Sequence, residues 1–123
     1  MPSQDPFQHS KSLHLESSKY LAGGVSSNFR LGGAPVPLFF ERGCGSRIYT
    51  VDGRVYVDYV LGMGPVILGH APQNVIQKVS DCLIKGQLYA GQHEAEKELA
   101  RLICSAVPCA ERVRFGCSGS EVV

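Results

Sequence analysis

The alternation of apolar and polar residues between positions 36 and 60 predicts a small antiparallel sheet. Residues 37–41 are typical of one strand, and residues 43–46, which contain two glycines, are typical of a turn. A hairpin is expected next, with strands at residues 47–51 and 54–59. The pattern therefore indicates a three-stranded meander.

Apolar residues recur with the period of a helix in two stretches further along the chain. The first covers residues 72–85, begins with a proline, which suits a first helical position, and ends at Gly86. The second covers residues 94–107, carries acidic residues early and is stopped by Pro108. The apolar faces consist of Val75, Ile76, Val79, Cys82 and Leu83 in the first helix and of Ala95, Leu99, Leu102, Ile103 and Ala106 in the second.

The hairpin turns at Asp52-Gly53, a pair that is typical of tight turns. The pattern leaves open whether the turn has two residues or three, the third being Val51 in a turn with a bulge. Val55 and Val57 lie on one face of the second strand, because side chains alternate along a strand. We expect both valines to be buried against the apolar face of the helix at residues 72–85.

The N-terminal part of the chain is polar. Residues 1–12 are expected to form a disordered or loosely docked tail. A short helix is expected at residues 13–21, where Gly23-Gly24 stops it. Residues 23–30 have the composition of a loop or a flexible linker, and Arg30 at its end is suited to bind a carboxylate through its planar guanidinium.

Residues 61–70 combine three glycines and a proline with large apolar residues, in the order Leu-Gly-Met-Gly-Pro-Val-Ile-Leu-Gly-His. Solvent-exposed linkers do not have this composition, so we expect the segment to be buried, for instance as the floor of a site. His70 at its end is compatible with a catalytic group, although a cap or a hydrogen-bonded core histidine is the more common role.

The last stretch of the chain predicts a strand, a tight turn and the start of a helix. The strand is expected at residues 113–116, where apolar residues alternate with polar ones. Ser118 is suited to cap a helix, and Glu121 stands three residues later, where a capping box has its acid. We expect the N–H groups of Gly119 and Ser120 to have no backbone acceptor, so that the turn suits a phosphate. No lysine follows the glycine as in a P-loop, and a simple capped helix fits the same residues.

The chain has 123 residues, of which 44% are apolar, and a formal net charge of +1. This size corresponds to one small domain or to a piece of a larger one. The nearly neutral charge argues against binding to nucleic acid or a membrane surface, and no apolar run reaches the length of a membrane span. The start lacks the apolar core of a leader peptide, so the cytoplasm is the expected location. Five cysteines without C-x-x-C spacing give no reason to expect a disulfide framework or a metal site.

Five stretches of the chain, taken together, resemble the N-terminal part of class III pyridoxal-phosphate-dependent aminotransferases, in the order and spacing of that family. The resemblance covers about residues 20–123. The resemblance is strongest to the glutamate-1-semialdehyde aminomutase branch, because of the glycines, serines and arginine in residues 23–30. The five stretches are residues 23–30, 45–58, 64–70, 93–100 and 113–121.

The resemblance implies an α/β fold, namely the N-terminal part of a fold-type I PLP-dependent transferase. A small antiparallel meander with helices would be followed by the first strand and helix of the large domain. The expected division is a flexible tail and short helix at residues 1–20, a small-domain segment at residues 21–110, and the truncated start of the PLP-binding domain at residues 111–123. The resemblance also implies a homodimer in the complete enzyme.

The resemblance further implies transfer of an amino group through an imine with pyridoxal 5'-phosphate or pyridoxamine 5'-phosphate. The substrate would be a small amino acid or amino-aldehyde. By similarity Ser118, Gly119 and Ser120 would bind the cofactor phosphate, and Arg30 would bind the substrate carboxylate. The cofactor ring serves as the electron sink in such reactions.

The chain departs from the family pattern at three points. Cys117 stands where the family usually has asparagine, and Gly62-Met63 stand where the aminomutases usually have Ser-Trp. The family's Schiff-base lysine, the aspartate for the pyridine nitrogen and the stacking aromatic lie beyond Val123. No catalytic residue is therefore expected in this fragment, which should be inactive alone, because none of the helical lysines replaces the missing one: Lys78, Lys85 and Lys97.

Two alternatives remain beside an aminotransferase or aminomutase. One is a short, inactive relative that binds a phosphate-bearing ligand or a partner subunit. The other is an unrelated small α+β domain with a capped helix, which the five ordered stretches make the weakest of the three hypotheses.

Overall fold

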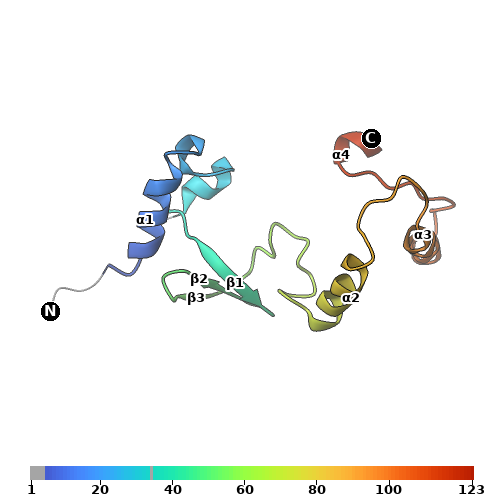
Figure 1. Cartoon of the computed structure of the whole chain (residues 1–123), viewed down its shortest axis with the longest axis horizontal. Helices are drawn as coiled ribbons and strands as arrows, with labels where there is room; N and C mark the ends of the chain where they lie inside the picture. The colour runs from blue at the N-terminus through green and yellow to red at the C-terminus, as the bar shows by residue number, and fades with distance from the viewer. Residues whose placement is uncertain (1–4, 34) are drawn as a thin grey trace. The chain divides into compact units, whose positions relative to one another are not determined.

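The computed structural model describes residues 5–33 and 35–123, and the elements appear in Figure 1 in chain order. The chain divides into two compact units, one up to Ser80 and the other from Asp81 to Val123. The domain division at residue 110 that the family resemblance implies stays a prediction, and the first four residues of the expected tail lie outside the described part.

The predicted meander is present in the first unit. It consists of β1 (Phe40–Cys44), β2 (Arg47–Thr50) and β3 (Val55–Val57), paired in that order and antiparallel throughout (Figure 1). The first strand lies three residues later than expected at both ends. The pairing of Cys44 with Arg47 leaves only two residues for the connection, so the turn predicted at residues 43–46 is shorter. Gly45 makes this tight connection possible, because its φ is +54°.

The hairpin between β2 and β3 turns through three residues, which settles the alternative that the sequence left open. Thr50 N–H donates to the Arg54 carbonyl over 2.9 Å, and Gly53 N–H donates to the Thr50 carbonyl over 2.9 Å. Gly53 has a φ of +75°, the left-handed conformation that closes a three-residue hairpin loop. Val51 therefore belongs to the turn together with Asp52.

Helix α1 (Gln8–Ser17) begins five residues before the helix predicted at residue 13 and ends before residue 21. Residues 8–12 are therefore helical, and the prediction of a loose tail there is wrong. The physical reason is a distant cap. The Asp52 carboxylate accepts from the N–H of His9 over 2.8 Å and from the N–H and hydroxyl of Ser10. Locally, Asp5 accepts from the N–H groups of Phe7 and Gln8, through its carboxylate and its carbonyl. The acceptor for His9 and Ser10 therefore comes from the distant Asp52.

The loop expected at residues 23–30 contains two short 3-10 turns, η1 (Ala22–Gly24) and η2 (Asn28–Gly32). The buried interior of the first unit lies nearby, where α1 meets the hairpin turn. Ser10 and Thr50 are completely buried, and Val36 is the only large apolar residue that is buried within the described ranges. The interior of this unit is thus small and partly polar.

Helices α2 (Gln73–Leu83) and α3 (Glu94–Ala106) confirm the two predicted amphipathic helices, within two residues at their ends. Pro72 precedes α2 directly, as expected. The imidazole of His93 caps α3 by accepting from the N–H of Ala95 over 3.1 Å. None of the helices in residues 5–33 and 35–123 combines the length and the apolar character needed to cross a lipid bilayer.

The prediction that Val55 and Val57 of β3, the second strand of the hairpin, are buried is wrong. Val55 and Val57 are each 51% exposed, and Val79 on the apolar face of α2 is 48% exposed. Periodicity identifies the apolar face of an element but not the surface that covers it. In the described residues these apolar faces do not cover one another.

The expected burial of residues 61–70 is also wrong, since Met63 is 68% and Leu68 69% exposed. The glycines of this segment serve its backbone conformation instead. Gly62, Gly64 and Gly69 all have positive φ.

We predict that the Asp52→Ala substitution loosens the start of α1, because the first helical N–H groups lose their acceptor. Amides in the first turn should exchange with solvent faster by roughly three- to thirtyfold, as expected for loss of a helix cap. Hydrogen exchange resolved by peptide or residue measures this. Glu111→Ala, an exposed change elsewhere, should leave α1 unaffected, and unchanged exchange in the Asp52 variant would contradict the capping role.

Candidate functional site

The predicted turn near the end of the chain is a helix start. Helix α4 (Gly119–Val122) follows Ser118, whose extended backbone, with φ −143° and ψ 158°, is that of an N-cap residue. The Glu121 carboxylate accepts from the N–H of Ser118 over 3.0 Å and from the N–H of Cys117. The capping acid therefore stands where the sequence predicted it.

The strand predicted at residues 113–116 is absent from the described part of the chain. The segment has no regular secondary structure, and none of the described strands pairs with it. Alternation of side chains favours an extended backbone, but a strand also needs a neighbour to hydrogen-bond. Neither the alternation nor the small-residue turn that follows it supplies that neighbour.

The turn from Ser118 to Ser120 leaves donors available to an anion. Glu121 N–H donates to the Ser118 carbonyl over 3.1 Å, whereas in residues 5–33 and 35–123 the N–H groups of Gly119 and Ser120 have no acceptor. This agrees with their place in the first helical turn. A Cβ atom built on Gly119 meets no heavy atom within 4 Å, so the backbone is open to approach. The residues present fit a phosphate, which needs such donors and space.

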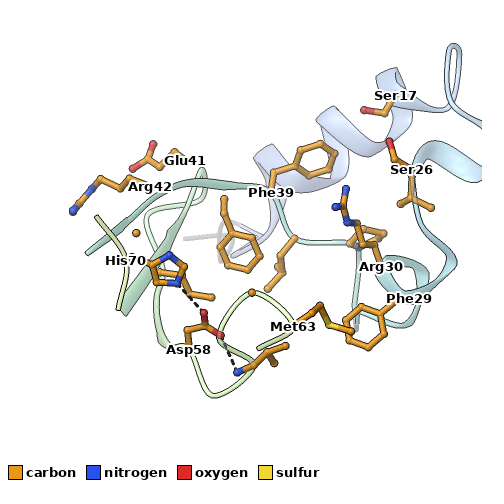
Figure 2. Close-up of a pocket in the computed structure, with 18 of the residues that line it drawn as sticks. Ser17, Ser26, Phe29, Arg30, Phe39, Glu41, Arg42, Asp58, Met63 and His70 are labelled. Atoms are coloured by element: carbon orange, nitrogen blue, oxygen red, sulfur yellow. Dashed lines mark hydrogen bonds and ion pairs between the residues drawn. The ribbon is translucent and has the colours of Figure 1, made fainter. Parts of the chain in front are cut away.

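Arg30 lies in η2, in the first unit, and lines a groove of about 780 Å³ (Figure 2). Phe29, Phe39 and Met63 supply much of the apolar lining, and in Figure 2 the Met63 side chain points toward the Phe29 ring. Within residues 5–33 and 35–123 the Arg30 guanidinium forms no ion pair or side-chain hydrogen bond. It is thus a cation beside an apolar surface and is available to an anionic ligand.

One wall of the groove contains a hydrogen-bonded pair, Asp58 and His70, that the sequence reasoning missed. Asp58 directly follows β3, and its Oδ2 accepts from Nε2 of His70 over 2.8 Å (Figure 2). Its Oδ1 accepts from the N–H groups of Val60 and Leu61 over 2.9 and 3.0 Å. The hydrogen bond from His70 and those from the backbone hold the pKa of the Asp58 carboxyl below its usual value. Its side chain is only 7% exposed, so the carboxylate is well shielded from water.

The outcome for His70 agrees with the more common of its two expected roles, since its ring is hydrogen-bonded to a buried carboxylate. A signal was present in the sequence. An aspartate at the end of a strand and a histidine at the end of the following glycine-rich loop are candidates to meet across that loop. The loop was interpreted by its composition alone, which gives no pairing.

The backbone between Asp58 and His70 is unusual. Leu61, Gly62, Met63 and Gly64 have φ values of +53°, +60°, +72° and +113°, so four consecutive residues are left-handed. Glycine adopts this region readily, whereas each leucine or methionine there costs about 1–2 kcal/mol. The segment must therefore be held by its surroundings.

The predicted site residues fall into two groups. Ser118, Gly119 and Ser120 lie together in one turn of the second unit, and Arg30 lies in the groove of the first unit.

The class-III aminotransferase family model matches residues 29–123 of the chain. The chain belongs to this family. The matched range includes Arg30, the Asp58–His70 pair and the turn at Ser118–Ser120.

Individual relatives agree with this assignment. A glutamate-1-semialdehyde 2,1-aminomutase of Saccharolobus islandicus is 44% identical over 113 residues, which are 92% of this chain and 26% of the relative. An omega-transaminase of Sphaerobacter thermophilus is similar in structure with a TM-score of 0.83 and 32% identity, covering 91% of this chain and 25% of that one. A Sphingopyxis protein solved with PLP has a TM-score of 0.83 and 27% identity, covering 93% and 28%.

The class-III chain thus spans about a quarter of the length of the relatives that it matches. The expected fold class, an α/β part of a fold-type I PLP-dependent transferase, is confirmed by the similarity to these transaminase structures.

We predict that the Asp58 carboxylate stabilises the protein above its ordinary pKa and that this contribution is lost in acid. A carboxyl whose pKa is lowered by folding binds its proton less readily in the folded state, so its stabilisation disappears as pH falls through the lowered pKa. The difference in urea midpoint between wild type and Asp58→Asn should be largest above the ordinary pKa of the carboxyl and should shrink as the pH falls through the lowered pKa of Asp58. A difference that persists at the lowest pH would contradict the prediction.

Proposed function

We propose that this class-III chain is part of an enzyme that transfers an amino group with pyridoxal 5'-phosphate or its pyridoxamine form. Its substrate would be a small amino acid or amino-aldehyde, with aminomutase activity as the closer candidate. The family match over residues 29–123 and the 44% identity to an aminomutase support the proposal. The single structural observation that carries it is the open helix start at Ser118, with two donors that have no acceptor among the described residues.

The cofactor phosphate would be held by the turn at Ser118–Ser120. The N–H groups of Gly119 and Ser120 and the two serine hydroxyls are the donors that this chain offers. Glu121 orients the turn, because its carboxylate occupies the N–H groups of Cys117 and Ser118. The donors left for the phosphate are therefore those at the tip of the turn.

When bound, pyridoxal 5'-phosphate supplies an aldehyde for the amino group and a ring that accepts electrons. The contribution of this chain is to bind and orient. Arg30 would bind the substrate carboxylate in a charge-assisted, fork-like pair, and the apolar side chains beside it would exclude water from that pair. The complete enzyme would be a homodimer in the cytoplasm.

A second candidate function is that of a short relative, which binds a phosphate-bearing ligand or a partner subunit without catalysis. The turn at Ser118–Ser120 supports it, because the donors of this turn do not depend on a catalytic lysine. Incubation with PLP, borohydride reduction and peptide mapping separate the two candidates. A single labelled lysine together with amino transfer supports the enzyme, whereas phosphate binding without either supports the binding module.

We predict that Gly119→Pro weakens binding of PLP. Proline suits the first helical position, and the extended Ser118 before it is compatible with proline, so the helix start should persist while one N–H donor is lost. The dissociation constant, from PLP absorbance or fluorescence, should rise about tenfold, since the lost bond is to a charged group. Gly119→Ala keeps the N–H and should bind within about threefold of wild type. Equal PLP affinity of wild type, Gly119→Pro and Gly119→Ala would show that this turn does not bind the phosphate.

We also predict that, in the complete enzyme containing these residues, Arg30→Ala weakens binding of substrates through their carboxylate. The KM of a carboxylate-bearing amino donor should rise roughly ten- to a hundredfold, because a charged hydrogen-bonded pair is lost. A donor amine without a carboxylate should be much less affected. Arg112→Ala, an exposed arginine outside the groove, is the matched control. A similar rise in KM for the donor with a carboxylate and the donor without one would show that Arg30 does not bind the carboxylate.

A further inference from the structure

The segment from Asp58 to His70 is fixed to the sheet at both ends. The N–H of Asp58 donates to the Ser46 carbonyl over 2.8 Å. At the other end, His70 and Gly45 exchange two backbone hydrogen bonds of 2.8 and 3.0 Å. The His70 ring packs on Gly43, where a Cβ atom would lie 2.5 Å from Cγ of the ring. The segment is therefore a closed loop with a defined base.

The Asp58 side chain joins the two ends of this loop. One carboxylate oxygen accepts from the backbone of Val60 and Leu61 at the start of the loop, and the other accepts from His70 at its end (Figure 2). The carboxylate thus has three donors and is shielded from solvent. These contacts hold the backbone where the left-handed run at residues 61–64 begins.

The left-handed run places Met63 at the groove. Within the run, the N–H groups of Met63 and Gly64 donate to the Val60 carbonyl over 3.0 and 3.1 Å. Met63 lines the groove together with Phe29 and Arg30. Its backbone is in a region that methionine rarely adopts, so the position of its side chain depends on the contacts that keep the run left-handed.

We infer that Asp58 and His70 are positioning residues, which hold the left-handed run at residues 61–64 and so keep Met63 in the groove wall that receives the substrate side chain next to Arg30. The inference rests on the proposed function, because it takes the groove to be the substrate site. Neither residue needs to touch the substrate. Met63 would then set how large an apolar group fits beside the bound carboxylate.

The two residues make unequal contributions, which gives the inference a graded test. Asp58→Ala removes the acceptor of two backbone N–H groups and the partner of His70. His70→Ala removes one donor but keeps the hydrogen bonds from the N–H groups of Val60 and Leu61 to the carboxylate. His70→Gln keeps an N–H donor at a similar reach and should restore most of what His70→Ala loses.

The first measurement is hydrogen exchange at residues 60–64 in the protein. Asp58→Ala should accelerate exchange there about tenfold or more, His70→Ala less, and His70→Gln least, because charge-assisted hydrogen bonds are lost in that order. Asp52→Ala is the matched control. It removes another carboxylate that accepts from two backbone N–H groups in the same unit, but those lie in α1. Its effect should be confined to α1.

The second measurement is the amino-transfer rate of the complete enzyme that contains these residues, with alanine and with phenylalanine as amino donors. Asp58→Ala should raise the KM for phenylalanine about tenfold with kcat within about threefold, since only binding of the side chain is lost. The KM for alanine should change less, and His70→Gln should resemble wild type. Asp52→Ala should change the KM for alanine and the KM for phenylalanine by the same factor. A general loss of folding would lower kcat for both donors and would not be rescued by glutamine.

Two outcomes overturn the inference: unchanged exchange at residues 60–64 in Asp58→Ala, or faster exchange there with the same KM ratio for the two donors as in wild type. Failure of the proposed function looks different. A complete wild-type enzyme containing these residues that transfers no amino group from any donor contradicts that function, and the exchange measurement then decides by itself whether the Asp58–His70 pair holds the loop.

Discussion

The hydrogen bonds of the Asp58 carboxylate are the interaction on which the groove depends. A carboxylate has enough acceptor sites for several donors, and here it takes two from the backbone after β3 and one from His70. A neutral side chain could not hold this many donors equally well. Because the loop between these contacts contains a leucine and a methionine in left-handed conformation, its shape is kept by the contacts rather than by local preference.

Features that depend on a few neighbouring residues were predictable from the sequence. The hairpin turn, helices α2 and α3, and the capped start at Ser118 each follow from periodicity or from a cap within four residues. Features that depend on distant partners were not. The burial of Val55, the strand at residues 113–116 and the role of the loop before His70 all required knowledge of what lies opposite, which a linear pattern does not contain.

The candidate site was predictable to the same extent. The helix start at Ser118 was predictable because a capping residue and its acid lie within four residues, whereas phosphate binding by Ser118, Gly119 and Ser120 stays a prediction. Arg30 was singled out by its chemistry, but the apolar groove around it combines η2, the chain before β1 and the loop after β3, which meet only in the folded chain. The pair of Asp58 and His70 likewise joins residues twelve positions apart.

The cap of α1 has a consequence for the order in which the chain folds. The acceptor for His9 lies 43 residues later, in the turn between β2 and β3. During synthesis the first helical turn therefore leaves the ribosome long before its cap exists, and a helix of ten residues is marginal in water without support. The N-terminal helix is thus a late element, which becomes stable only after the hairpin behind it has closed.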